Sequence, residues 1–247
     1  MTTANGKTVL VTGGSRGIGA AIARQLAGIG MNVVINYASD EGTANAVVAS
    51  ITAIGGVANA VKGDVSKSDQ FAHLFDQAES RFGGLDMLVN NAGQMSPMLI
   101  ADVDEEKFDR LFAINVRGVL NGCKLAAKRL RDGGRIVNIS TSVIGMSPAG
   151  YGPYCATKAA VEALTRSLCK EVGQRGIRVN AVAPGPTDTE LLNSANSENR
   201  MKMYASTTPL ARLGQADDIA RVVVFLATDE AGWINGQTIR VNGGLVA

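Results

Sequence analysis

Continuous apolar runs alternate with helical patterns along the whole chain, and this alternation constrains the fold more than any other feature. Runs such as Val33-Val34-Ile35 and Ile136-Val137 are uninterrupted, which is typical of strands covered on both faces. Strands separated by helices imply right-handed βαβ units and a parallel sheet. We therefore predict an α/β fold, a doubly wound parallel sheet of about seven strands with helices on both faces. The predicted strands are Thr8–Val11, Asn32–Tyr37, Val57–Lys62, Asp86–Asn90, Arg135–Ser140, Arg178–Ala183 and Thr238–Val241.

No proline- or serine-rich linker divides the chain, so we expect a single domain over residues 1–247. One helix is expected to open at Asp102, because Glu105 follows three residues later in an acidic version of a capping box. The one long irregular stretch is Pro184–Pro209, which is polar between Asn193 and Arg200. Long irregular stretches in compact domains are usually functional lids or disordered. We interpret this one as a substrate lid at about residues 187–209.

A glycine-rich segment, Thr12–Gly19, follows the first predicted strand and opens the first predicted helix. A helix N-terminus offers free N–H groups and a partial positive charge, which suit a pyrophosphate. Gly13 and Gly17 can adopt backbone conformations that other residues avoid, and Gly19 lets the helix approach the strand or a cofactor closely. The segment therefore predicts a dinucleotide-binding site at the first strand–helix turn.

The residues around this turn favour NADP(H) over NAD(H). An NAD-preferring site usually has an acidic residue at the end of the second strand to bond the ribose hydroxyls. That strand ends in Asn36-Tyr37-Ala38-Ser39, with no acid at Tyr37. Arg16 lies inside the glycine loop, where a guanidinium could grip a 2′-phosphate. Asp40 and Glu41 follow the strand directly and leave NAD(H) open as the alternative.

Net charge and rare residue types exclude several classes of protein. A net charge of +2 without a long basic run argues against nucleic-acid binding. His73 is the only histidine, which excludes a Ser-His-Asp hydrolase and a multi-histidine metal site. Cys123, Cys155 and Cys169 show no metal-ligand spacing and indicate reduced thiols in a cytoplasmic protein. The first strand begins near Lys7, which leaves no room for a signal peptide, and no apolar run reaches the length of a membrane span.

A phenol and an ammonium group lie four positions apart in Tyr154-Cys155-Ala156-Thr157-Lys158. Residues i and i+4 share one face of a helix. A free phenol has a pKa near 10, and a cation about 5 Å away at an effective dielectric near 20 contributes about 3 kcal/mol, or about two pKa units. We therefore expect Lys158 to lower the pKa of Tyr154, so that the phenol can exchange a proton. Tyr151 cannot form such a pair, because Cys155 stands four residues after it.

Together and in this order, these motifs resemble those of the short-chain dehydrogenase/reductase family over essentially the whole chain. The chain is similar to the family's single-domain branch of about 250 residues, which includes 3-oxoacyl-acyl-carrier-protein reductases and NADP-dependent carbonyl reductases. The resemblance implies a Rossmann-like fold and hydride transfer between a nicotinamide cofactor and a carbonyl or alcohol. The matching motifs are Thr12-Gly13-x-x-x-Gly17-x-Gly19, Asn90-Asn91-Ala92-Gly93, Asn115, Ser142, Tyr154-x-x-x-Lys158, Pro184-Gly185 and Thr189.

The resemblance also implies a role for each catalytic position. Tyr154 would be the proton donor in reduction and the base in oxidation, and Lys158 would also bond the nicotinamide ribose. Three consecutive hydroxyl residues follow the fifth strand, and the family register favours Ser142 as the one that bonds the substrate oxygen. Asn115 would hold a water molecule that relays protons to the lysine.

Further contacts implied by the resemblance are mostly with the backbone. The expected cofactor-binding residues are Gly13, Ser15, Arg16, Gly17, Ile18, Gly19, Asn36, Tyr37, Ala38, Ser39, Asp64, Val65, Asn91, Ala92, Gly93, Tyr154, Lys158, Pro184, Gly185, Thr187 and Thr189. The expected substrate pocket contains Gln94, Ser142, Val143, Met146, Tyr151 and Tyr154.

Three functional hypotheses follow. The first is an NADP(H)-dependent reductase or dehydrogenase that acts on a ketone or aldehyde and the corresponding CH–OH group. The second is a 3-oxoacyl-acyl-carrier-protein reductase of fatty acid synthesis, which would dock its acidic carrier through basic residues at the ends of two adjacent helices. Arg175 occupies one such position, but Asp132 occupies the other, with Arg129 and Arg131 beside it. The third is a non-catalytic, NADP-sensing binding protein, which would not need the four catalytic positions that this chain retains.

The expected partners are a small carbonyl or alcohol substrate and further copies of the same chain, with no nucleic acid and no membrane. The family usually forms homotetramers or homodimers through two helical regions, here Asp104–Leu130 and Tyr154–Val172, and through the C-terminal segment. That segment, from Gly236 to Ala247, bears glycines and is fairly apolar, so it would pack better against a partner than in water.

Overall fold

The computed structural model describes residues 4–194 and 197–246, and its centre is a parallel sheet. The strands follow the order β3-β2-β1-β4-β5-β6-β7, with every neighbouring pair parallel. Their bounds are β1 Thr8–Val11, β2 Asn32–Tyr37, β3 Val57–Lys62, β4 Leu85–Asn90, β5 Leu130–Ile139, β6 Arg178–Pro184 and β7 Thr238–Val241. The predicted doubly wound sheet is therefore confirmed.

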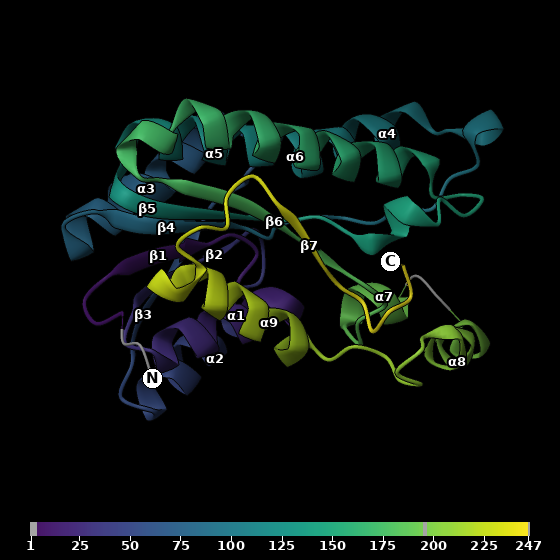
Figure 1. Cartoon of the computed structure of the whole chain (residues 1–247), viewed down its shortest axis with the longest axis horizontal. Coiled ribbons are helices and arrows are strands. Elements are labelled where there is room, and N and C mark those ends of the chain that lie inside the picture. Colours follow the sequence, from purple (N-terminus) through teal and green to yellow (C-terminus); the bar gives the residue numbers. More distant parts are fainter. Residues whose placement is uncertain (1–3, 195–196, 247) are drawn as a thin grey trace.

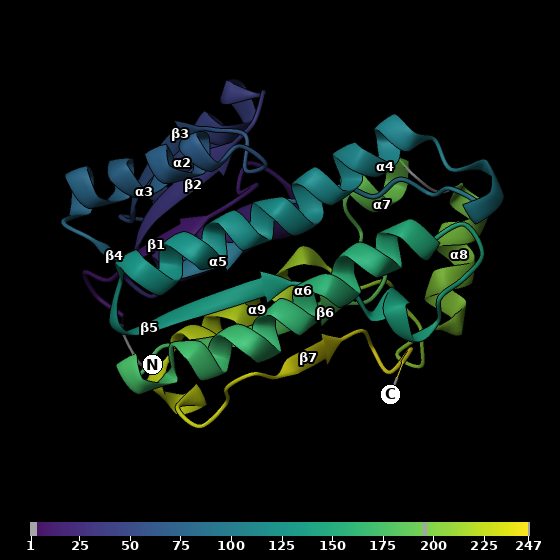
Figure 2. The same cartoon turned by 90° about the horizontal axis from the view of Figure 1, so that it is seen from above.

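Helices cover both faces of this sheet, giving three layers (Figure 1). One face carries α1 (Gly17–Gly28), α2 (Glu41–Ala53) and α9 (Ala216–Ala227). The other carries α3 (Ser68–Phe82), α5 (Gly118–Arg129) and α6 (Gly152–Glu171). The short α4 (Glu105–Phe112) runs through a π-helical turn, Ala113–Arg117, into α5. The two remaining α-helices of the described residues, α7 (Glu190–Ser194) and α8 (Glu198–Thr207), lie beyond one end of the sheet (Figure 2).

Two cores explain why the strand sequences are continuously apolar. Successive strand residues point to opposite faces, and in β1 Val9 and Val11 join the core under α1 and α9 while Leu10 joins the core under α3 and α5. All three side chains are fully buried. Because both faces exclude water, no polar alternation is needed along the strand.

The order of the strands places a switch point beside β1. Strand β1 pairs with β2 on one side and with β4 on the other, so the connections run in opposite directions from this point. Ligands of open α/β sheets bind outside the carboxyl ends of the strands at such a point. Figure 2 shows α7 and α8 at the end of the molecule toward which the β5 arrow points.

Two local predictions are wrong. The helix expected at Asp102 begins at Glu105 instead, because the Asp104 side chain caps it by accepting a bond from the Lys107 N–H at 3.0 Å. Asp102 ends a short 3₁₀ turn. The stretch expected to be irregular carries α7 and α8, although residues 195 and 196 within it, like residue 247 of the C-terminal segment, lie outside the described residues. Among the described residues, no helix has the length and apolar character needed to cross a bilayer.

Candidate active site

A cavity of about 420 Å³ opens at the carboxyl end of the sheet. Its walls come from the segments that follow β1, β2, β3, β4, β5 and β6, together with α6 and α7. Every residue predicted to bind the cofactor lines this cavity. The sheet therefore gathers residues that are scattered over most of the chain into a single site.

The chemistry of the first turn of α1 suits an anionic group. Its N-cap residue is Arg16, whose side chain makes no capping hydrogen bond, and no acidic residue lies in the first turn. The backbone N–H groups and partial positive charge of this helix end face the cavity. Gly17 has φ +53°, a conformation that favours glycine, at the turn into the helix. These features fit the pyrophosphate of a dinucleotide.

The glycine loop is held against β4 so tightly that one position admits only glycine. A Cβ atom on Gly19 would lie 2.3 Å from the Gly13 carbonyl oxygen and 2.5 Å from Nδ2 of Asn91. Asn91 Nδ2 donates to the carbonyl oxygens of Thr12 and Gly13, at 2.9 and 3.0 Å. The motif at the end of β4 thus fixes the shape of the loop at the start of α1.

Tyr154 and Lys158 lie on the first turns of α6, and both side chains are buried at the cavity wall. Lys158 Nζ donates to the Ile139 carbonyl oxygen at 2.8 Å. Burial lowers the pKa of Lys158 to about 8, because a charged ammonium loses its hydration there. Burial raises the pKa of Tyr154 to about 12, with a smaller opposing contribution from a side-chain hydrogen bond with Thr141.

The predicted fall in the pKa of Tyr154 is therefore wrong for this structure. The prediction weighed the attraction of a nearby cation and left out desolvation of the phenolate. Because both side chains are buried, desolvation is the largest effect on the pKa of Tyr154 and the one that lowers the pKa of Lys158.

Asn115 is completely buried in the π-helical turn between α4 and α5. Its side-chain oxygen accepts from the Gln94 N–H at 2.8 Å, and its Nδ2 donates to the Gln94 carbonyl oxygen at 2.9 Å and to the Thr157 hydroxyl at 3.1 Å. A Cβ atom on Gly93 would meet both the Asn115 side-chain oxygen and Lys158 Nζ at 3.4 Å. Asn115 thus ties the segment after β4 to α6 beside the lysine, and π-helical turns are frequent at functional sites.

Ser142 does not line the cavity in this structure, and its catalytic role stays a prediction. The residue is 3% exposed, its Oγ donates to the Ala183 carbonyl oxygen at 2.8 Å, and it accepts from Asn242 Nδ2 at 3.1 Å. The side chain is directed toward β6 and the C-terminal segment. Its neighbour Thr141 lines the cavity instead.

Only part of the expected substrate pocket lines the cavity. Gln94 and Tyr154 do. Val143 and Tyr151 instead pack beside Tyr154 in an apolar cluster, and Met146 is 39% exposed outside the cavity wall. Lining residues that the cofactor and substrate predictions missed include Asp40, Thr43, Gly63, Arg110, Ile114, Ile139, Ser140, Leu191 and Leu192.

Two charged residues at the mouth of the cavity, Arg16 and Asp40, already have side-chain partners. Arg16 Nη1 lies 3.1 Å from both carboxylate oxygens of Glu190, the first residue of α7, and both side chains are about 70% exposed. The Asp40 carboxylate caps α2 by accepting from the Thr43 N–H at 3.0 Å. Arg16 thus links the glycine loop to α7, and Asp40 is occupied at its helix end.

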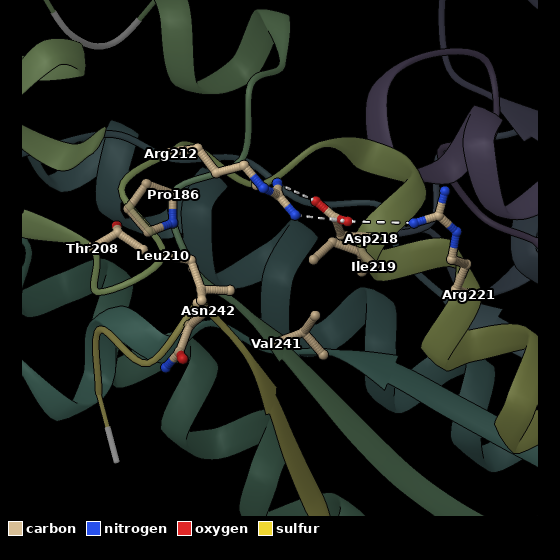
Figure 3. A pocket seen from close by; sticks show the side chains of 12 residues that line it. Pro186, Thr208, Leu210, Arg212, Asp218, Ile219, Arg221, Val241 and Asn242 are labelled. Atoms are coloured by element: carbon tan, nitrogen blue, oxygen red, sulfur yellow. Dashed lines mark hydrogen bonds and ion pairs between the residues drawn. The ribbon is translucent and has the colours of Figure 1, made fainter. Parts of the chain in front are cut away.

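A second cavity of about 250 Å³ is lined by Gly185, the segment after α8, the start of α9 and the end of β7 (Figure 3). Along its rim, Arg212 Nη1 lies 2.6 Å from the Asp218 carboxylate, and Arg221 lies 3.5 Å from the other carboxylate oxygen. This ion pair with Arg212 lowers the pKa of Asp218 and holds the segment after α8 against α9. Asn242 forms the opposite wall, and its amide points away from the arginines in Figure 3.

Comparisons with known proteins agree with this geometry. A family model described as enoyl-(acyl carrier protein) reductase matches residues 13–246. An uncharacterised oxidoreductase of Methylorubrum extorquens is 46% identical over 99% of this chain and 100% of its own length. A 3-oxoacyl-[acyl-carrier-protein] reductase of Staphylococcus aureus is 42% identical over 97% of this chain and 98% of its own length. A short-chain dehydrogenase of Burkholderia cenocepacia, solved in complex with NADP, is 39% identical with a TM-score of 0.92 and 98% of both chains covered. This chain belongs to the short-chain dehydrogenase/reductase family of oxidoreductases, in its single-domain branch.

Proposed function

We propose that this chain is an NADP(H)-dependent oxidoreductase that reduces a ketone or aldehyde to an alcohol, or catalyses the reverse, with Tyr154 as the proton donor. The observation that supports the proposal is that Tyr154, Lys158 and the N-terminus of α1, which has no side-chain cap, all line one cavity. Carbonyl reduction needs a hydride and a proton delivered to one bond. The cofactor would supply the hydride, and the tyrosine would supply the proton.

The protonation states of the two residues suit reduction. With its pKa raised to about 12, the Tyr154 phenol holds its proton at neutral pH and can donate it to a carbonyl oxygen. With its pKa lowered to about 8, Lys158 can lose a proton near neutral pH and so replace the one that Tyr154 gives up. Asn115, bonded to Gln94 and Thr157, would keep the loop above Lys158 in place and, by resemblance to the family, hold the relay water.

The experiment that tests this role is loss of NADPH absorbance with a panel of ketones, β-keto esters and acyl thioesters. We expect wild-type turnover of at least one class, and Tyr154→Phe to abolish it while NADPH still binds with an affinity within about threefold of wild type. Tyr151→Phe is the matched control, and it should keep at least about a tenth of the turnover because no lysine follows four residues on. Near-normal activity of Tyr154→Phe would exclude the proposed proton donor.

We expect Glu190 and the 2′-phosphate of NADP(H) to compete for the Arg16 guanidinium, and this competition would set the cofactor preference. We propose that NADP(H) is preferred, because no free carboxylate stands at the end of β2 and Asp40 is engaged at its helix; the complex of the Burkholderia cenocepacia relative with NADP supports this. NAD(H) is the alternative. Arg16→Ala should weaken NADPH binding about tenfold, as expected for a charged hydrogen bond worth roughly 1.5 kcal/mol, and leave NADH binding unchanged.

Glu190→Gln gives the complementary test. Freeing Arg16 should strengthen NADPH binding by no more than about fivefold, because an exposed ion pair is worth at most about 1 kcal/mol. Binding is followed by the fluorescence of the reduced cofactors at fixed ionic strength. Equal affinity for NADPH and NADH that neither substitution changes would refute the preference.

A carrier-protein reductase is the second candidate, favoured by the 42% identity to the Staphylococcus aureus enzyme. The surface that would dock the carrier is less basic than its arginines suggest. Arg175 bonds the Asp132 carboxylate at 2.7 Å. Arg129 pairs with Asp76 and Glu79, and Arg131 pairs with Asp86. An acetoacetyl group on acyl carrier protein that is turned over no better than its N-acetylcysteamine thioester would exclude this candidate.

Four further expectations stay proposals. A non-catalytic NADP sensor would show cofactor binding without turnover of any carbonyl in the panel. The segment at residues 187–209 would serve as the substrate lid, since α7 lines the cavity. A homotetramer or homodimer would cover the fully exposed Trp233 and is tested by sedimentation at micromolar concentration. A cytoplasmic location rests on the three unpaired cysteines.

A further inference from the structure

The guanidinium of Arg200, on α8, lies between two tyrosine rings. Its central carbon is 5.6 Å from the centre of the Tyr151 ring and 5.9 Å from the centre of the Tyr204 ring. Both distances fall within the range of a cation–π contact. Tyr151 is the N-cap residue of α6, so this side chain of α8 contacts the start of the helix that carries Tyr154. Figure 2 shows α8 beside that end of α6.

The half of this contact that lies within α8 follows from residue spacing. Arg200 and Tyr204 are four residues apart and therefore share one face of the helix. Ser197 caps α8 by accepting from the Arg200 N–H at 3.4 Å, which places Arg200 in the first turn. Tyr204 is buried, and its carbonyl oxygen accepts from the N–H and the hydroxyl of Thr208, at 3.1 and 2.7 Å. The Tyr204 ring is thereby fixed on α8.

The other half of the contact joins Arg200 to the surroundings of Tyr154. Tyr151 is buried in an apolar cluster with Leu111 and Tyr154. The Tyr151 and Tyr154 rings meet edge to face, with centres 6.5 Å apart and planes at 74°, which is a favourable arrangement for an aromatic pair. Four described side chains, Tyr204, Arg200, Tyr151 and Tyr154, thus form a continuous stack from α8 to α6. Among these four, Tyr154 alone lines the main cavity.

The charge of Arg200 has no carboxylate partner within residues 4–194 and 197–246. The one acidic residue of α8, Glu198, pairs with Lys202 at 2.7 Å. Arg200 is only partly exposed, and a partly desolvated cation is attracted to an aromatic face more strongly than an exposed one. The two tyrosine rings are therefore the partners of this charge, and an uncharged side chain of similar length would lose the cation–π attraction to both.

We propose that Arg200 is a positioning residue that docks α8 against Tyr151 and so holds the proposed lid closed beside Tyr154. The inference rests on the proposed function, in which Tyr154 reacts with a carbonyl and residues 187–209 form the lid. The form that binds the carbonyl substrate is the one with α8 docked, and its share of the population scales the apparent substrate affinity. Neither Arg200 nor Tyr151 lines the cofactor cavity, so NADPH binding depends little on this contact.

The kinetic test compares Arg200→Met with the control Lys202→Met, which removes an exposed cation from the same helix. Each is assayed with NADPH and whichever of cyclohexanone, ethyl acetoacetate and acetoacetyl-N-acetylcysteamine wild type reduces fastest. Arg200→Met should raise KM for the carbonyl substrate about tenfold, as expected for loss of a partly desolvated cation–π contact, with kcat and NADPH affinity within about threefold of wild type. Lys202→Met should change each value by about twofold or less, because an exposed ion pair contributes little. A variant that was merely less folded would lose kcat without this rise in KM.

A double-mutant cycle links the effect to the Tyr151 ring. Tyr151→Leu removes the ring, whereas Tyr151→Phe keeps it. Because Arg200 docks α8 through that ring, Arg200→Met should raise KM about tenfold in the Tyr151→Phe background but about twofold or less in the Tyr151→Leu background. Equal tenfold rises in both backgrounds would overturn the inference, because Arg200 would then act through some other contact.

Hydrogen exchange of the backbone amides tests the docking without turnover. Arg200→Met should speed exchange across α8 about tenfold, with α9 and Tm as in wild type, because only the docking of one helix is weakened. Exchange of α8 that is the same in Arg200→Met and Lys202→Met would overturn the inference, as would an unchanged KM. Wild type that reduces none of the three probes would instead refute the proposed function, and the exchange of α8 would still decide whether Arg200 docks this helix.

Discussion

The buried ammonium of Lys158 should make this protein less stable at neutral pH than an apolar side chain would. Lys158 is 4% exposed, and its only hydrogen bond among those the structure describes goes to the Ile139 carbonyl oxygen. Burial lowers its pKa from 10.5 to about 8. At about 1.4 kcal/mol per pKa unit, holding the charged form in the fold costs about 3 kcal/mol.

The sign of the pH dependence follows from which state binds the proton more tightly. The folded pKa of Lys158 lies below the unfolded value, so between pH 8 and 10.5 the unfolded chain holds more protons and stability rises with pH. Below pH 8 both states are protonated, and the folded protein bears the full cost. Lys158→Met removes that cost but also loses a charged hydrogen bond worth about 1.5–3 kcal/mol.

We therefore expect Lys158→Met to equal or exceed wild type by up to about 2 kcal/mol at pH 7.5, although it is inactive. Between pH 7.5 and 10.5 wild type should gain about 3 kcal/mol relative to the variant. Burial raises the pKa of Tyr154 to about 12, and loss of the nearby cation would only raise it further, so folded Tyr154 stays protonated in both proteins and the unfolded tyrosine titrates alike in both.

The assay is urea unfolding at equal protein concentration, followed by far-UV circular dichroism. Tryptophan fluorescence is unsuitable because the single tryptophan, Trp233, is fully exposed. Lys124→Met, which changes an exposed lysine on α5, is the control and should follow the wild-type pH dependence. A stability difference between wild type and Lys158→Met that stays constant from pH 7.5 to 10.5 would refute the reasoning.

Two more predictions concern packing. Gly19→Ala should destabilise the protein by about 1–3 kcal/mol and weaken NADPH binding, because the new Cβ would lie 2.3 Å from the Gly13 carbonyl oxygen and 2.5 Å from Asn91 Nδ2. The control Gly28→Ala lies on the same helix, where a Cβ would have nothing within 4 Å, and it should leave urea unfolding and NADPH binding nearly unchanged. Equal effects of the two substitutions would contradict this prediction. Burial raises the pKa of the Cys123 thiol to about 12. Maleimide at pH 8 should therefore label the partly exposed Cys169 in the folded protein and Cys123 only after unfolding, as measured by peptide mass spectrometry. Rapid labelling of Cys123 in the folded protein would show that this thiol is not buried.

Local sequence patterns determined much of the sheet, because a strand buried on both faces leaves a continuous apolar run such as Val33-Val34-Ile35. The bounds of β1, β2, β3 and β7 are those predicted, and the glycine loop lies between β1 and α1 as expected. The cavity-lining residues were predictable for the same reason, since parallel strands end at one edge and the residues after them must meet there.

Only the tertiary structure decided what the individual polar groups do. Ser142 and Thr141 are adjacent in sequence, and their opposite directions depend on partners at Asn242 and Ala183, which are distant along the chain. The pKa of Tyr154 rises because the surrounding chain removes water, a cost that depends on burial on all sides and not on the spacing of Tyr154 and Lys158. Sequence spacing sets which elements form and where they end, whereas desolvation and long-range hydrogen bonding depend on the whole fold, and these decide which hydroxyl lines the cavity and which groups hold a proton.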